Sequence, residues 1–275
     1  MSVLITGGSG TIGTALAKLL LARGEPRVCI LSRGEAAQAR MREAMPQEAL
    51  RFFVGDVRDQ QRLRRAMQGC NTVYHCAALK RIEVGAYNPI EMVRTNVDGS
   101  VNVIEAAMDA GVARVVHCST DKAHEPVSPY GYSKALADTL FLAANEYTPG
   151  TRFEIVRLGN VAGSTGSVIP TWRAAIAAGR PVMITDPDCT RFWMSPKDAA
   201  QALIDSESPV ELPAYMLADL YEAMREATLE WAQSVYDITG LRPFEKQHEI
   251  LRPGYSSADA RRMSVAELKA ALCAL

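Results

Sequence analysis

The chain has 275 residues, of which 48% are hydrophobic and 22% are charged, and its formal net charge is -1 with a pI near 6.5. This size and composition allow a large buried core and exclude a mainly disordered chain. The near-neutral charge excludes a general attraction to nucleic acid or to an anionic membrane, so we expect small-molecule partners bound at local sites.

Short apolar runs alternate with amphipathic stretches over the first 160 residues. The runs 3–6, 28–31, 51–54, 72–76, 114–118 and 153–157 are rich in Val, Ile or Phe and too short for helices. Between them, helical patterns at 11–22 and 98–110 are followed by Gly24 and Gly111, which favour the left-handed cap conformation. The alternation predicts an α/β fold with a Rossmann-like, doubly wound parallel sheet.

A glycine-rich segment, ITGGSGTIGTAL at 5–16, follows the first strand and opens the first helix. It fits GxGxxG starting at Gly8, or GxxGxxG starting at Gly7. Glycines let the backbone turn tightly and approach a pyrophosphate, whose charge is bound by free amides at the helix N-terminus. The expected cofactor-binding residues here are Gly7, Ser9, Gly10, Thr11, Ile12 and Gly13.

The second strand ends in Ser32 and Arg33, where an NAD-selective site usually offers a carboxylate to the ribose 2′-hydroxyl. A guanidinium pairs bidentately with a 2′-phosphate, so NADP is favoured over NAD. Asp56 and Val57 follow the third strand and are expected at the adenine edge. A helix cap is the alternative role for Asp56, and both roles can hold.

The fifth predicted strand leads into STDKAHEPVSPYGYSK, residues 119–134. If a helix begins near Pro129, Tyr130 and Lys134 lie one turn apart on the same face. A Lys ammonium beside a phenol lowers the phenol pKa, and the tyrosinate takes a proton from an alcohol while hydride leaves the same carbon. Asp121 and Lys122 form a second acid–base pair at the strand end.

After about residue 160 the alternation stops, and Gly and Pro punctuate shorter segments. Helices are predicted at roughly 196–206, 217–237 and 264–274. We expect an NADP-binding domain at 1–160 that carries the catalytic residues. A smaller nucleotide-sugar-binding lobe is expected at 161–275, with an approximate boundary and with segments free to return to the first domain.

The first residues, MSVLITGGSG, lack a basic region followed by a long apolar one, and no stretch reaches the roughly 18 apolar residues of a membrane span. A cytoplasmic protein is therefore expected. The six cysteines, at positions 29, 70, 76, 118, 189 and 273, show no CxxC spacing. Buried reduced thiols are favoured over a disulfide or zinc framework, and no metal site is expected.

Motifs along nearly the whole chain resemble one family. They are GGSGTIG, HCAALKRIEVGAYNP, TNVDGSVNVIEAA, STDKAHEPVSPYGYSK, RLGNVAGSTGSVIP, ITDPDCTRFW, RPFEKQHE and YSSADARRMSVAEL. On these motifs the chain is similar to the extended short-chain dehydrogenases/reductases. Within them it resembles the C5-inverting UDP-N-acetylglucosamine 4,6-dehydratases of polysaccharide biosynthesis. Phe244 and Gln247 depart from the family's RPGEKLHE pattern.

The resemblance implies oxidation of a hexose C4 hydroxyl, elimination of water across C5–C6 and return of hydride to C6. It places Thr120 at the C4 oxygen and Tyr130 with Lys134 in the oxidation. It implies that Asp121 protonates the leaving hydroxyl and that Lys122 is the base at C5. Retaining relatives carry Asp-Glu where this chain has Asp-Lys, so Lys122 points to inversion.

The resemblance also implies contacts with the cofactor and the substrate, a UDP-sugar. The further cofactor positions are Ala77, Ala78, Lys80, Asn96, Tyr130 and Lys134. The substrate positions are Lys80, Asn160, Ser167, Val168, Arg191, Arg242 and Glu245, the last three near the diphosphate and uridine. A helix-start Lys, a capping Asn and exposed surface arginines are the alternatives for Lys80, Asn96 and the two arginines.

Two other functions remain open at this point. A 4-epimerase or reductase of the same superfamily needs only Thr120, Tyr130 and Lys134. A non-catalytic NADP-binding protein has no need of both acid–base pairs. A homo-oligomer is also expected, because related enzymes associate through helices that flank the sheet. The apolar helix 133–144 either serves that contact or packs within the subunit.

Overall fold

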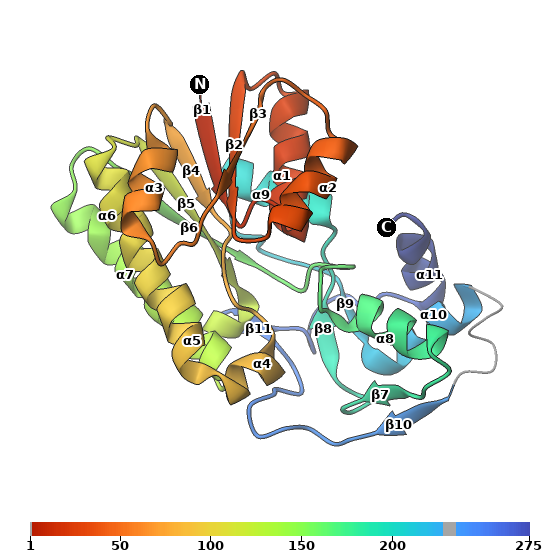
Figure 1. Cartoon of the computed structure of the whole chain (residues 1–275). Helices are drawn as coiled ribbons and strands as arrows, with labels where there is room; N and C mark the ends of the chain where they lie inside the picture. Colours follow the sequence, from red (N-terminus) through yellow and green to blue (C-terminus); the bar gives the residue numbers. More distant parts are fainter. Residues whose placement is uncertain (1, 228–234) are drawn as a thin grey trace.

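The structure is a computed structural model that describes residues 2–227 and 235–275 (Figure 1). Six parallel strands form one sheet in the order β3-β2-β1-β4-β5-β6. The strands are β1 (Ser2–Thr6), β2 (Arg27–Ser32), β3 (Leu50–Val54), β4 (Thr72–His75), β5 (Arg114–Thr120) and β6 (Arg152–Leu158). All six correspond to predicted apolar runs, and the Rossmann-like fold class is confirmed.

Helices cover both faces of the sheet (Figure 1). One face carries α1 (Thr11–Ala22), α2 (Glu35–Ala44) and α9 (Pro196–Asp205), and the other carries α3 (Gln60–Met67), α6 (Gly99–Asp109) and α7 (Pro129–Tyr147). The central strands are buried because they lie between these two layers. The predicted caps are confirmed, since Gly24 and Gly111 have φ values of +79° and +64°.

Short helical segments connect the strands near the carboxyl ends of β4 and β5. They are α4 (Ile82–Tyr87), α5 (Pro89–Val93), the π-helical turn η1 (Arg94–Asp98) and the 3₁₀ turn η2 (Asp121–Ala123). Because η2 follows β5 directly, its side chains lie where the sheet ends, which is the usual ligand-binding edge of such folds.

The C-terminal part of the chain builds a second core beside the sheet. Its elements are α8 (Val168–Ala177), β7 (Val182–Ile184), β8 (Thr190–Phe192), β9 (Ala214–Met216), α10 (Leu217–Ala227), β10 (Tyr236–Ile238), β11 (Ile250–Arg252), β12 (Tyr255–Ser256) and α11 (Val265–Cys273). Trp172, Leu220 and Leu268 are buried together there. In contrast, Ala199 and Leu203 of α9 pack with Leu16 of α1 in the core of the sheet domain.

The predicted helix over 217–237 is wrong at its end. The described helix stops at Ala227, and residues 228–234 lie outside the described part of the chain. Tyr236–Ile238 forms β10, which pairs in parallel with Val182–Ile184. A partner strand distant in sequence therefore overrides the local helical pattern.

All six cysteines are free thiols; Cys29, Cys70 and Cys189 are buried as predicted, whereas Cys76 and Cys118 are partly buried and Cys273 is exposed. Across the described ranges, no helix combines the length and the apolar character needed to cross a membrane.

Candidate active site

The first cavity lies over the N-terminus of α1. Its lining includes every glycine-loop residue expected to bind cofactor, and also Ser32, Arg33, Asp56, Val57, Ala77, Ala78 and Lys80. Gly10 is the N-cap of α1 and brings no side chain to the first helical amides. These amides suit an anion such as a pyrophosphate.

Three glycines of the loop have no room for a side chain. Gly7 has φ +65°, and a Cβ there would lie 2.8 Å from the Ala77 backbone. A Cβ on Gly13 would lie 2.5 Å from Gly8 Cα. A Cβ on Gly8 would lie 2.8 Å from Ile30 Cγ2, but Gly8 does not line the cavity. The register that fits is therefore Gly7, Gly10 and Gly13.

The end of β2 carries a hydroxyl and a guanidinium at the rim of this cavity. Ser32 Oγ accepts hydrogen bonds from Ser9 Oγ at 2.8 Å and from Gln38 Nε2 at 3.0 Å. Arg33 is exposed and lies 3.9 Å from the Asp56 carboxylate. Burial tends to raise the pKa of Asp56, but its hydrogen bonds with Arg58 lower it, so this carboxylate is ionised.

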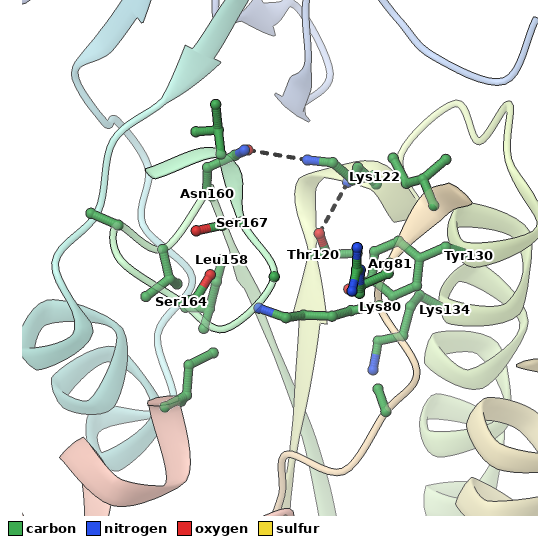
Figure 2. A pocket seen from close by; sticks show the side chains of 18 of the residues that line it. Lys80, Arg81, Thr120, Lys122, Tyr130, Lys134, Leu158, Asn160, Ser164 and Ser167 are labelled. Atoms are coloured by element: carbon green, nitrogen blue, oxygen red, sulfur yellow. Dashed lines mark hydrogen bonds between the residues drawn. The ribbon is translucent and has the colours of Figure 1, made fainter. Parts of the chain in front are cut away.

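The second cavity adjoins the first and has a volume of about 280 Å³. Figure 2 shows its two walls: Lys80, Thr120, Lys122, Tyr130 and Lys134 come from the sheet domain and face the segment that follows β6. That segment contributes Asn160, Ser164, Ser167 and Val168.

The start of α7 positions the predicted Tyr-Lys pair. Ser128 caps the helix by accepting a hydrogen bond from the Gly131 amide at 3.0 Å, and Pro129 occupies the first turn. Tyr130 and Lys134 are both buried side by side along one helix face, and both line the cavity.

Lys134 contacts the strand rather than the phenol. Its Nζ donates to the Cys118 carbonyl at 2.7 Å and lies 3.0 Å from His117 Nε2. Burial raises the pKa of Tyr130, and within the protein the charge of Lys122 is the main effect that opposes this rise. The expected lowering of the Tyr130 pKa by a neighbouring Lys134 is therefore not present in this structure.

Thr120, Asp121 and Lys122 form a connected group at the end of β5. Asp121 is fully buried, and its Oδ1 accepts from Thr120 Oγ1 at 2.9 Å and from Lys122 Nζ at 3.1 Å. Its Oδ2 has no hydrogen-bond partner among the described residues. Burial raises the pKa of Asp121, against the effect of Lys122, which suits a carboxyl that delivers a proton.

Lys122 points into the cavity, where its Nζ also donates to Asn160 Oδ1 at 3.1 Å (Figure 2). Burial alone would lower the pKa of Lys122, but the Asp121 and Glu249 carboxylates raise it well above its usual value. Lys122 thus lies on the same cavity as Tyr130, whereas Asp121 is buried behind Lys122 and is not among the residues that line the described cavities.

The other expected residues lie in different places. Asn96 is buried and lines neither cavity; it accepts from the Leu79 amide, and its Nδ2 donates to the Leu79 carbonyl and to Ser133 Oγ. Glu245 lines the second cavity, and Arg191 lines an extension of it. Arg242 is exposed, and its backbone amide donates to the Glu245 carboxylate at 3.3 Å.

Sequence reasoning missed Glu249, which lies in this extension. The side chain is buried, and its Oε1 lies 3.2 Å from Lys122 Nζ. The motif RPFEKQHE includes Glu249, but nothing in the motif indicates that the segment returns to η2.

A family model described as "Polysaccharide biosynthesis protein" matches residues 3–267. The UDP-N-acetylglucosamine 4,6-dehydratase (inverting) of Campylobacter jejuni is 37% identical over 262 residues, covering 91% of this chain and 77% of the relative. The UDP-glucose 4-epimerase of Rickettsia conorii is 35% identical over 271 residues, with the same shares covered.

Two solved structures are also similar. Pen from Bacillus thuringiensis matches with a TM-score of 0.93 and 30% identity, covering 100% of this chain and 97% of that chain. The dTDP-glucose 4,6-dehydratase DesIV of Streptomyces venezuelae, with NAD and TYD bound, matches with a TM-score of 0.81 and 26% identity, covering 92% and 89%.

Proposed function

This chain belongs to the polysaccharide biosynthesis protein family within the extended short-chain dehydrogenases/reductases, and we propose that it is an NADP-dependent, C5-inverting UDP-N-acetylglucosamine 4,6-dehydratase. The observation that carries the proposal is that Tyr130 and Lys122 line one cavity and that Lys122 Nζ donates to the buried Asp121 carboxyl directly behind it. Oxidation alone requires only the first of these, whereas elimination requires an additional acid and base.

The bound nicotinamide supplies the hydride acceptor for C4 and the hydride donor for C6. Tyr130 takes the proton of the C4 hydroxyl, and Thr120 donates a hydrogen bond to the C4 oxygen. The C4 ketone acidifies C5–H, so that Lys122 as a neutral amine removes this proton. Asp121 protonates the C6 hydroxyl, which leaves as water; once hydride has returned to C6, a proton derived from solvent adds to C5 on the face opposite to Lys122.

Two features support NADP as the cofactor. Arg33 lies on the cavity rim at the end of β2, and this strand end offers no carboxylate of its own. Because a guanidinium pairs well with a phosphate, a 2′-phosphate suits this position. The loop from Gly7 to Gly13 and the uncapped α1 N-terminus suit the pyrophosphate.

We also propose that the chain acts as a homo-oligomer, joined through α5 and α7. These two helices pack together, and they expose Ile90, Val93, Tyr132 and Leu136. The opposite face of α7 packs within the subunit, since Phe141 and Ala144 are fully buried. Helix 133–144 therefore has both an internal face and an exposed apolar face.

The experiment is incubation with NADP and UDP-N-acetylglucosamine in heavy water, followed by proton NMR of the product. A 4-keto-6-deoxy sugar with deuterium at C5 is expected, with coupling constants of the inverted isomer. Absence of any 4-keto product from the common UDP-hexoses would refute the proposal.

A 4-epimerase is the second candidate, because curated relatives at 35% identity carry that name. An epimerase product keeps its C6 hydroxyl and takes up no solvent deuterium at C5. The same NMR experiment therefore separates the two functions.

A further inference from the structure

The side chain of Lys122 is held as an ammonium ion, which has no lone pair with which to accept a proton. Its Nζ lies 3.1 Å from Asp121 Oδ1, 3.1 Å from Asn160 Oδ1 and 3.2 Å from Glu249 Oε1. A lysine ammonium has three N–H donors and no acceptor, so these three oxygens occupy all of them. Before Lys122 can act as a base at C5, one proton must leave it.

Two carboxylates contact the ammonium, and the reaction gives them opposite tasks. Asp121 must hold a proton for the leaving hydroxyl, and burial favours its protonated form. A carboxyl that is already protonated cannot accept another proton. Glu249 is the other neighbour, and its Oε2 accepts no hydrogen bond from the described residues.

The backbone holds Glu249 firmly in place just before β11. Its amide donates to Ser257 Oγ at 2.9 Å, and the Ser257 amide donates to its carbonyl at 2.8 Å. Ser257 is fully buried and donates in turn to the Thr190 carbonyl at 3.1 Å. The carboxylate is therefore presented to Lys122 by a fixed segment.

Three cations surround this carboxylate. Besides Lys122, Lys246 Nζ lies 3.4 Å from Oε2 and Arg191 Nε lies 3.9 Å from Oε1. Burial alone would raise the pKa of Glu249, but these three charges lower it. An anionic substrate bound beside Arg191 and Lys246 offsets their charge and so raises the proton affinity of Glu249.

We propose that Glu249 is a positioning residue that takes a proton from Lys122 when the nucleotide diphosphate binds, so that Lys122 meets the sugar as a neutral amine. The inference rests on the proposed dehydratase function. An N–H bond of Lys122 breaks and an O–H bond forms on Glu249. The amine lone pair then takes the C5 proton, and the C5–H electrons expel the C6 hydroxyl, which leaves as water with the Asp121 proton.

The decisive variant is Glu249→Gln, which keeps the shape and removes the proton acceptor. C4 oxidation, followed at 340 nm, should persist, while product formation and C5 deuteration at pH 7 should fall about 10²-fold. The deficit should shrink about tenfold per pH unit between roughly pH 7 and 9, because solvent then deprotonates Lys122. A deficit constant over this range, or no deficit, would overturn the inference.

The matched controls separate this role from folding and from neighbouring titrations. The other titratable side chains around the pair are Lys80, Asp121, Tyr130, Arg191, Tyr215, Glu245 and Lys246. All of these groups are retained in the control variant Glu211→Gln, which changes an exposed residue. This variant should keep the pH profile of the wild type. Glu249→Asp restores a carboxylate and should recover the shape of the wild-type pH profile even if its rate is lower; a rate that rises with pH relative to wild type, as in Glu249→Gln, contradicts the inference.

An infrared difference spectrum gives a readout that does not depend on turnover. Binding of UDP-N-acetylglucosamine should produce the carbonyl band of a newly protonated carboxyl group, and Glu249→Gln should lose it. If the wild-type protein forms product but shows no such band, the role of Glu249 is refuted and the proposed function is not. Wild-type protein that forms no 4-keto product refutes the proposed function instead.

Discussion

At the residue scale, the proposed mechanism assigns the two acid–base pairs to different carbons, so that their effects should be separable. Tyr130 lies on α7, whereas Asp121 and Lys122 lie on the turn after β5. A variant of one pair therefore tests one half of the reaction.

Asp121→Asn should leave C4 oxidation intact and slow the elimination by about 10²- to 10⁴-fold. The amide keeps the hydrogen bond from Thr120 but has no proton to give to the leaving hydroxyl. Because burial raises the Asp121 pKa, its acid form persists to higher pH than that of an ordinary Asp and is lost as pH rises through that pKa. The wild-type kcat should therefore decline on the alkaline side as Asp121 loses its proton. The kcat of Asp121→Asn should lack this decline. The measurements are 340 nm absorbance and product NMR across pH; unchanged elimination would favour the epimerase.

Arg33→Ala should weaken NADP binding about 10- to 100-fold and leave NAD binding nearly unchanged. The guanidinium lies at the end of β2, where only the 2′-phosphate distinguishes the two cofactors. Fluorescence titration with NADPH and NADH measures both affinities. Equal losses of affinity for both cofactors would show that Arg33 does not recognise the 2′-phosphate.

At the element scale, the turn between β1 and α1 depends on close backbone packing. Gly13→Ala places a Cβ 2.5 Å from Gly8 Cα, so the turn must shift. We expect a loss of about 1–3 kcal/mol in folding free energy and a weaker thermal shift on adding NADPH. Gly150→Ala is the control, because nothing lies within 4 Å of a Cβ there. Equal melting temperatures for the two variants would contradict the expectation.

The six strands of the sheet were predictable because each is a short apolar run, and α1 and α6 were predictable because a glycine marks the end of each helical pattern. The helix α8 was not predicted because Pro170 interrupts its pattern, yet this proline sits in the first turn, where no intrahelical N–H bond is needed. Strand β10 was read as helix because its partner, β7, is distant in sequence. The same limit applies to the site: the motif after β5 indicated Asp121 and Lys122, but the return of Glu249 onto Lys122 is a tertiary contact that no local pattern encodes.

At the scale of the whole molecule, side chains from both parts of the chain join across the cavity. Lys122 reaches Asn160 and Glu249, and Lys246 Nζ donates to the His124 carbonyl at 2.9 Å. The catalytic turn is therefore fixed by the C-terminal part as well as by the sheet. The helices α5 and α7, which expose Ile90 and Leu136, lie on the side of the sheet opposite α1 (Figure 1).

The oligomer prediction concerns these two helices. Ile90 and Leu136 expose 62% and 49% of their surface on two helices that pack together, and a second copy that covers them would remove this apolar surface from water. Light scattering should give the wild type a mass of at least twice 29.9 kDa. The double variant Ile90→Asp with Leu136→Asp should shift the mass to that of one chain, because each interface would then bury four carboxylates in a dimer. Val210→Asp, at an apolar residue that is 65% exposed in a different region, should keep the wild-type mass. A wild-type mass of 29.9 kDa, or a double variant that stays assembled, would show that α5 and α7 do not form the interface.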